Sequence, residues 1–206
     1  MSQNTWVHRA VRPMVKLLAR TSISPNQVTT ARLCFGLAAA AVAAIGPEPW
    51  FAIGAGLFVV SFLLDRADGA LARMTNKSSP SGHRYDSLAD VACNGAIFFG
   101  IGIALRDGPL GWWMAALGAF VGVAMVTGLL IDLPLKAAGS DAAEIEVAGF
   151  DLDDAMLIPP LAMWTGWTAP LLYAAAIGAP LFALFLAWKL RQIRRPRAGA
   201  GTRQPP

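Results

Sequence analysis

The sequence has few charged residues. Asp, Glu, Lys and Arg together make up 15% of its 206 residues, whereas 55% of the residues are hydrophobic. Soluble domains contain about 25% charged residues, so this composition and the mean hydropathy of +0.50 exclude an ordinary soluble domain. Long stretches, among them 50–64 and 91–105, carry no charge at all. We therefore predict an integral membrane protein.

Residues that support several common chemistries are also scarce. The two cysteines, Cys34 and Cys93, lie in apolar stretches away from any Cys/His ligand spacing, so we expect two small buried side chains. His8 and His83 are the only histidines, and there is no G-x-S-x-G motif, which leaves serine or cysteine hydrolysis without support. The net charge of +4 fits the anionic inner face of a bilayer, and we expect no nucleic-acid partner.

The first 21 residues, 1–21, mix apolar side chains such as Val11 with basic ones such as Arg12 and Lys16. This pattern is typical of an amphipathic helix that lies in the membrane interface. Pro13 is expected to kink that helix.

Apolar segments long enough to cross a bilayer follow one another between residues 22 and 190. Polar turns with proline or glycine separate them. The pattern predicts one all-α domain, 22–190, with six transmembrane helices over residues 28–46, 50–73, 84–105, 110–133, 153–168 and 170–188. Residues 191–206 are basic and of low complexity, and we expect a partly disordered tail at the membrane surface.

Lys and Arg are distributed unevenly about the predicted spans. Six spans put both termini on one side, and sixteen of the 17 Lys and Arg residues fall on or near that side, with only Arg106 on the other. The positive-inside rule makes the basic side cytoplasmic. We therefore expect a multi-pass protein of the inner (cytoplasmic) membrane, with its site facing the cytoplasm.

Four carboxylates lie at fixed spacings on two neighbouring predicted spans. Asp65 and Asp68 are three residues apart on the second span, and Asp86 and Asp90 are four apart on the third. Each pair therefore shares one helix face. Because the short polar turn at 74–82 joins two antiparallel helices, all four acids are expected at the same depth.

Placing an acidic side chain beside a membrane costs free energy, so such residues usually mark a functional site. Carboxylates that face one space repel one another unless cations hold them together. Mg²⁺ and Mn²⁺ prefer oxygen ligands, and two such ions can bind one pyrophosphate. The structural alternative is that the acids only pair with Arg66, Arg73 and Arg84.

Eight residues of this region stand at fixed offsets: Asp65, Asp68, Gly69, Ala72, Arg73, Gly82, Asp86 and Asp90. This pattern resembles the complete signature of the CDP-alcohol phosphotransferase (CDP-alcohol phosphatidyltransferase) family. The segment Pro25-Asn26-x-x-Thr29 and the six-span layout are also similar to that family.

The resemblance implies a transferase that moves the phospho-alcohol part of a CDP-alcohol, such as CDP-diacylglycerol, onto an acceptor hydroxyl and releases CMP. It implies two Mg²⁺ or Mn²⁺ ions held by Asp65, Asp68, Asp86 and Asp90. It implies a CDP-alcohol pocket formed by Asp65, Asp68, Gly69, Ala72, Arg73 and Gly82. Such a reaction belongs to phospholipid biosynthesis.

A remaining carboxylate is needed to take the proton from the incoming hydroxyl. We assign this general base to Asp90, because it lies one turn deeper along its span than Asp86 and so nearer the lipid substrate.

The acceptor is a small alcohol whose identity stays open. The segment Ser87-Leu88-Ala89 followed by Val91 looks more like the phosphatidylserine synthase branch than the phosphatidylglycerophosphate branch. Phosphorylated acceptors, such as inositol phosphate or glycerol phosphate, need additional cations, for which Arg32, Arg84 and Lys136 are candidates. The alternative for Arg32 is a side chain that snorkels to the interface.

Two other classes of protein compete with this interpretation. A divalent-cation transporter would also place acids on spans, although transport calls for polar groups near the bilayer midplane. A non-catalytic membrane scaffold is the other alternative. Small residues on several spans also allow a homodimer.

Overall fold

The computed structural model describes residues 6–137, 146–147 and 150–194. Within these ranges the chain forms seven α-helices: α1 (Trp6–Leu18), α2 (Pro25–Ala43), α3 (Trp50–Met74), α4 (Pro80–Ala104), α5 (Trp113–Ala137), α6 (Ile158–Thr165) and α7 (Thr168–Arg194). A two-residue antiparallel pair, β1 (Glu146–Val147) with β2 (Phe150–Asp151), and a 3-10 helix, η1 (Leu152–Leu157), separate α5 from α6. The fold is helical as predicted, apart from this short pair. Most of the predicted tail, 195–206, lies outside the described residues.

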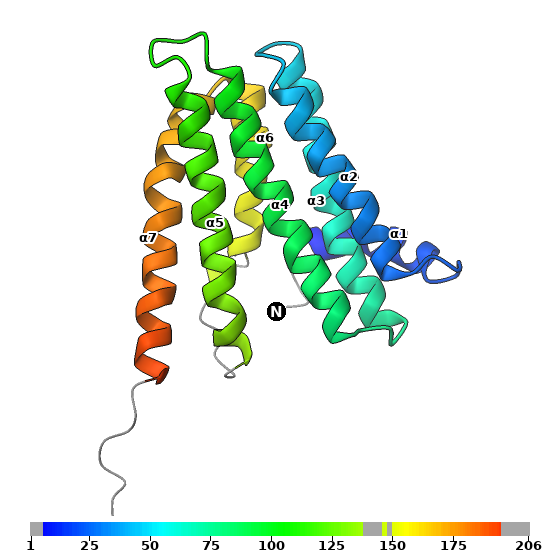
Figure 1. Ribbon diagram of the computed structural model, residues 1–206. Helices are drawn as coiled ribbons and strands as arrows, with labels where there is room; N and C mark the ends of the chain where they lie inside the picture. The colour runs from blue at the N-terminus through cyan, green and yellow to red at the C-terminus, as the bar shows by residue number, and fades with distance from the viewer. Residues whose placement is uncertain (1–5, 138–145, 148–149, 195–206) are drawn as a thin grey trace, which may run out of the picture.

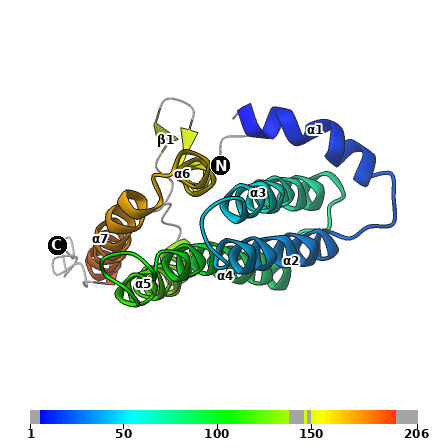
Figure 2. The same cartoon turned by 90° about the horizontal axis from the view of Figure 1, so that it is seen from above.

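The long helices run up and down beside one another (Figure 1). Helix α2 packs against α3 and α4, α4 packs against α5, and α5 packs against α7. In the view from above, α1 and α6 both pack against α3 on the side away from α2 (Figure 2). The end of α3, the start of α4 and the start of α2 therefore meet at one end of the bundle, which Figure 1 shows at the bottom.

Four of the described helices are long and apolar enough to cross a membrane: Trp50–Met74, Pro80–Ala104, Trp113–Leu135 and Thr168–Ile193. Helix α2 does not reach this standard, because its first turns carry polar residues such as Asn26 and Arg32. The helix predicted over 153–168 is replaced by η1 and the eight-residue α6. Pro159 and Pro160 lack N–H donors, so they fit the first turn of α6 but not the interior of a longer helix. Six crossings and the cytoplasmic location of the termini remain predictions.

Helix α1 confirms the expected N-terminal helix, with Pro13 inside it. Val11 and Val15 are buried and cluster with Leu71 of α3, whereas Lys16 is exposed. The helix is thus amphipathic, and part of its apolar face is covered by α3.

Serine and proline residues fix the starts of the two helices that enter the site. Ser24 accepts a hydrogen bond from the backbone N–H of Gln27, whose side chain accepts one from the Ser24 N–H, and Pro25 occupies the first turn. Ser79 caps α4 in the same way by accepting from the Gly82 N–H at 3.0 Å. Such caps satisfy N–H groups that have no partner within the helix. Helix α4 therefore begins at residue 80, four residues before the predicted start.

Glycines allow the helix backbones to approach closely along α4. A Cβ atom on Gly100 would overlap the carbonyl oxygen of Ala40 in α2. A Cβ atom on Gly118 in α5 would likewise overlap the carbonyl oxygen of Phe98. Small residues at helix contacts are a common solution in membrane proteins, and here they hold α4 between α2 and α5.

The two cysteines differ in environment. Cys93 is buried against Gly36 of α2, as expected, but Cys34 is exposed, so its predicted burial is wrong. Consecutive positions of a helix point in different directions, and the side of α2 that carries Cys34 faces away from α3 and α4.

Replacing Gly100 with valine is expected to destabilise the protein, because the new side chain would force α2 and α4 apart. Overpacking of this kind costs about 1–3 kcal/mol. Thermal unfolding of the detergent-solubilised protein measures the effect. Gly56→Ala is the control, since a Cβ atom at Gly56 meets nothing within 4 Å. Equal melting temperatures for the two variants would contradict the close approach of the helices.

Candidate active site

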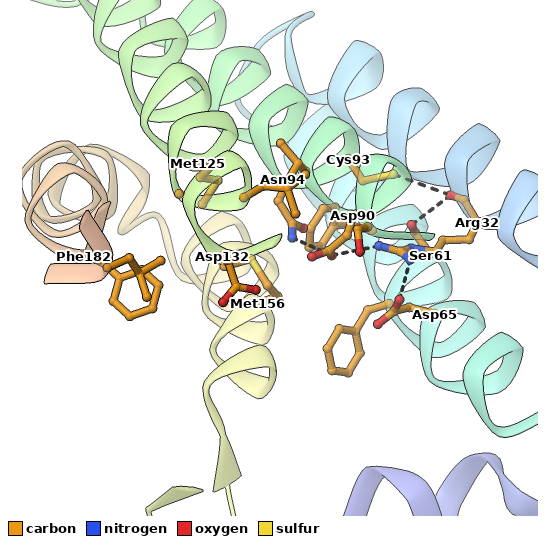
Figure 3. A pocket seen from close by; sticks show the side chains of 17 residues that line it. Arg32, Ser61, Asp65, Asp90, Cys93, Asn94, Met125, Asp132, Met156 and Phe182 are labelled. Carbon is orange, nitrogen blue, oxygen red and sulfur yellow. Dashed lines mark hydrogen bonds and ion pairs between the residues drawn. The ribbon is translucent and has the colours of Figure 1, made fainter. Parts of the chain in front are cut away.

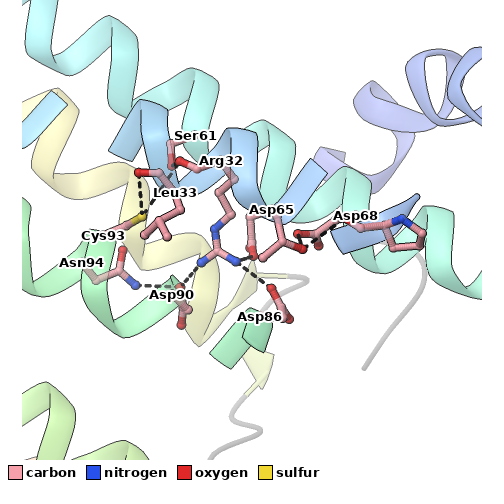
Figure 4. Close-up of polar contacts among 11 residues, drawn as sticks. Arg32, Leu33, Ser61, Asp65, Asp68, Asp86, Asp90, Cys93 and Asn94 are labelled. Atoms are coloured by element: carbon pink, nitrogen blue, oxygen red, sulfur yellow. Dashed lines mark hydrogen bonds and ion pairs between the residues drawn. The ribbon is translucent and has the colours of Figure 1, made fainter. Parts of the chain in front are cut away.

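Three of the four predicted carboxylates come together where α3 ends and α4 begins. One oxygen from each of Asp65, Asp68 and Asp86 lies within 4.8 Å of the other two (Figure 4). Asp68 is almost completely buried, whereas the side chains of Asp65 and Asp86 are 23% and 35% exposed. The spacing predicted from the sequence therefore produces a compact group of carboxylate oxygens.

Asp90 lies beside this group rather than in it. Its Oδ1 atom accepts hydrogen bonds from Arg32 Nη2 at 2.8 Å and from Asn94 Nδ2 at 2.9 Å. Its side chain is 48% exposed, the highest value among the acids that pair with Arg32. Asp90 is therefore the member of the set that a substrate reaches most easily.

Arg32 of α2 links the acids from both helices. Its guanidinium donates to Asp86 Oδ1 at 2.7 Å through Nη1 and also forms ion pairs with Asp65 and Asp90. Only 3% of its side chain is exposed, so the alternative that Arg32 snorkels to the interface is wrong. Three inward-facing carboxylates attract the guanidinium more strongly than the surface does, because opposite charges interact strongly in a poorly screened space.

Hydrogen bonds hold this arrangement in place. Ser61 Oγ of α3 donates to the backbone oxygen of Arg32 at 2.9 Å, which joins α2 to α3. Thr29 Oγ1 donates to Asp68 Oδ2 at 2.7 Å in a buried position. Orienting partners of this kind fix the geometry of ligand side chains.

The donor set fits a hard divalent cation. Carboxylate oxygens are the ligands that Mg²⁺ and Mn²⁺ prefer. The four carboxylates gather around Arg32, which forms ion pairs with three of them. Asp65, Asp68 and Asp86 are the residues that would hold a metal ion, with Asp90 at the edge of the group.

The other residues of the signature lie at the loop end of the two helices. Gly69 and Ala72 are partly buried on the last turns of α3, and Arg73 is exposed there. At Gly82 a Cβ atom would meet Ser79 Oγ at 3.0 Å and Asn26 Oδ1 at 3.2 Å. The side of the acids that faces the loop is therefore lined by small residues and one exposed arginine.

The segment at the start of α2 contributes to this side of the site. Thr29 orients Asp68, Asn26 lies beside Gly82, and Thr30 Oγ1 is 2.9 Å from Tyr85 Oη of α4. The sequence resemblance pointed to Pro25-Asn26-x-x-Thr29 without showing what it touches. The structure shows that this segment connects α2 to both acid-bearing helices.

The predicted acceptor residues lie in different environments. Arg32 is within the acid group, and Arg84 is exposed on the second turn of α4. The side chain of Lys136 lies outside the described part of the chain. Arg66, which the structural alternative pairs with the acids, has its guanidinium 5.1 Å from the centre of the Phe62 ring.

A cavity of about 250 Å³ opens on the other side of the acids, away from the loop (Figure 3). Asp65, Asp90 and Arg32 line it, together with Asn94 and with Asp132 of α5. Most of its other lining residues are apolar, and they come from α3, α4, α5, α7 and η1. Asp65 and Asp90 therefore belong both to the acid set and to the wall of the cavity.

Sequence reasoning missed Asp132 and Asn94. Asp132 is 6% exposed and is an acid near the end of an otherwise uncharged run of α5, which is the signal that would have identified it. Asn94 follows Asp90 by one helical turn, and the spacing rule used for the acids would have placed both on one face.

Comparison with known proteins gives two relatives. The chain is 30% identical over 159 residues to the phosphatidylinositol phosphate synthase of Corynebacterium glutamicum, covering 73% of this chain and 64% of that protein. It is 27% identical over 121 residues to the bifunctional IPC transferase and DIPP synthase of Thermococcus kodakarensis, covering 59% of this chain and 27% of that protein. The matched part is therefore less than two thirds of either relative.

Residues 22–189 match the family described as CDP-alcohol phosphatidyltransferase. This range contains the acid group, the start of α2 and the helices that line the cavity. The match confirms the resemblance carried by the eight signature residues. The chain belongs to the CDP-alcohol phosphatidyltransferase family.

Proposed function

We propose that this protein transfers the phosphatidyl part of a CDP-alcohol such as CDP-diacylglycerol to the hydroxyl of a small acceptor and releases CMP. The observation that carries the proposal is the convergence of Asp65, Asp68 and Asp86 from two helices, with Asp90 beside them in the wall of a cavity. Membership of the family supports a transferase of phospholipid synthesis.

In this proposal the loop side of the acids binds the cytidine diphosphate. Asp65, Asp68 and Asp86, with Asp90 at the edge of the site, would hold two Mg²⁺ or Mn²⁺ ions. Bound ions of this kind neutralise charge on the pyrophosphate and on the leaving phosphate. Arg73 is exposed at the same end and offers a charge-assisted hydrogen bond to a phosphate, and the small residues Gly69, Ala72 and Gly82 leave room for the nucleotide.

Asp90 is the proposed general base. The acceptor oxygen forms a bond to the phosphorus of the phosphatidyl group, and the bond from that phosphorus to the CMP oxygen breaks. The electron pair of the broken bond leaves with CMP, and the proton of the acceptor hydroxyl moves to Asp90. Its 48% exposed side chain and its position in the cavity wall support this role. Arg32 and Asn94 hold the carboxylate in place through Oδ1.

The distribution of charge supports the proposed location of the site. The acids lie at the same end of the bundle as Arg73, Lys77 and Arg84, whereas Arg106 lies at the opposite end of α4 and donates to the backbone oxygen of Ala44. By the positive-inside rule, this distribution supports a site on the cytoplasmic side of the inner membrane. A homodimer stays a prediction.

The direct test is CMP release from CDP-diacylglycerol by the purified protein with Mg²⁺ or Mn²⁺, using serine, inositol phosphate and glycerol phosphate as separate acceptors. CMP formed in the presence of one acceptor, together with the matching lipid product, supports the proposal. Absence of CMP with every acceptor and both metals would overturn it.

Asp90→Asn is expected to lower turnover by about 10²- to 10⁴-fold, because the amide cannot accept the proton. Metal binding should persist, since Asp90 lies outside the closest group of oxygens. Initial rates of CMP release and Mn²⁺ titration followed by electron paramagnetic resonance measure the two quantities. Asp107→Asn, a change at an exposed position on the far end of the bundle, is the control. Near-normal turnover in the Asp90 variant would exclude it as the base.

Thr29→Val is expected to weaken Mn²⁺ binding by about 10-fold, because Asp68 loses the hydrogen bond that orients it. Asp68→Asn should weaken Mn²⁺ binding further. Thr29→Ser keeps the hydroxyl and should restore most of the affinity. Unchanged Mn²⁺ affinity in both the valine and asparagine variants would place the metal elsewhere.

A further inference from the structure

Arg32 is held in place through both its backbone and its side chain. Its backbone oxygen accepts a hydrogen bond from Ser61 Oγ of α3 at 2.9 Å. One turn further along α2, a Cβ atom on Gly36 would overlap Cys93 of α4, so the two helices are in close contact there. Only 3% of the Arg32 side chain is exposed. Helix α2 therefore presents the guanidinium to the acids of α3 and α4 from a fixed position (Figure 4).

The guanidinium contacts acids of both helices at the same time. Its Nη1 atom pairs with Asp65 of α3 and lies 2.7 Å from Asp86 Oδ1 of α4. Its Nη2 atom lies 2.8 Å from Asp90 Oδ1, one turn further along α4. A planar guanidinium offers donors in several directions, whereas the ammonium group of lysine is a point charge. Arg32 thus connects α3 to α4 although it belongs to neither helix.

Two of these partners also belong to the group that would hold a metal ion. Asp65 and Asp86 contribute oxygens to that group, together with Asp68. An ion bound there would therefore share two carboxylates with Arg32. Carboxylates that face one another in a poorly screened space repel strongly, and a guanidinium keeps its charge at any pH at which proteins are studied. Arg32 can therefore offset this repulsion whether or not an ion is bound.

We propose that Arg32 is a positioning residue that holds the acids of α3 and α4 together before a divalent ion binds, and that the ion then takes over part of this role. The inference rests on the metal site of the proposed function but not on the transfer reaction. With the ligands already gathered, an arriving ion does not have to draw two helices together. Such preorganisation lowers the cost of binding.

The test compares the melting temperature of the detergent-solubilised protein in EDTA and in Mn²⁺. Arg32→Gln is expected to lower the melting temperature in EDTA by roughly 10 °C, because buried carboxylates lose their counter-charge. Mn²⁺ should then raise the melting temperature of Arg32→Gln by at least about twice as many degrees as that of the wild type, since the ion replaces the missing charge. Arg84→Gln is the matched control, because it removes one positive charge at an exposed position of α4.

A second variant tests whether the effect comes from repulsion. Adding Asp90→Asn to the Arg32→Gln protein removes one carboxylate and should restore about half of the lost melting temperature in EDTA, because replacing both partners of a buried pair costs less than removing one. Arg32→Lys keeps the charge and should fall between Arg32→Gln and the wild type. Recovery of folded Arg32→Gln only when Mn²⁺ is present during purification would be the same result in a stronger form.

Equal melting temperatures of Arg32→Gln and the wild type in EDTA would overturn the proposal. An equal rise with Mn²⁺ in the two proteins would also overturn it, since Arg32 would then only fill space between the helices. The same holds if neither Mn²⁺ nor the second substitution restores the stability of Arg32→Gln. These measurements need no turnover: absence of CMP release overturns the transferase and leaves the role of Arg32, whereas no effect of Mn²⁺ on either protein overturns this inference and the metal site together.

Discussion

Repulsion among carboxylates is the constraint on which this structure depends. Helices α3 and α4 bring their acids to one place, and a low-dielectric surrounding makes their mutual repulsion costly. Arg32 offsets part of it by pairing with acids of both helices. Because Arg32 belongs to α2, the start of that helix has to be polar, and this explains why α2 is less suited to crossing a membrane than its neighbours.

The bundle places two different environments on either side of the acids. Toward the α3–α4 loop lie the small residues Gly69, Ala72 and Gly82 and the exposed Arg73, and the proposed function assigns the nucleotide to this side. Toward the cavity the wall is mainly apolar, with Asp132 as a charged exception. Asp65 and Asp90 border the cavity and also belong to the acid set. A transferase needs such a border, because donor and acceptor have to meet at one phosphorus.

The acid group was predictable from the sequence because its spacing is local. Asp65 with Asp68, and Asp86 with Asp90, each follow from helix geometry and one short turn. The ion pairs of Arg32 with the acids were not predicted, because its partners are 33 to 58 residues away and only the packing of α2 reveals them. Asp132 was missed because it has no paired acid at helical spacing, although its position in an otherwise uncharged run of α5 is a local signal. The structure has η1 and the short α6 in place of the helix predicted over 153–168, because the consecutive prolines Pro159 and Pro160 restrict where a helix begins.

Helix α4 carries both Asp90 and the glycine that touches the backbone of α2. Gly100 is ten residues from Asp90, which is about 15 Å along the helix axis. The contact between Gly100 and α2 therefore fixes the position of α4 at a point well away from Asp90. A small shift of α4 at Gly100 would also shift the Asp90 carboxylate, because a helix bends little over three turns. Loss of turnover after a substitution near Gly100 would therefore arise from a shift of Asp90, and it would not show that Gly100 belongs to the active site.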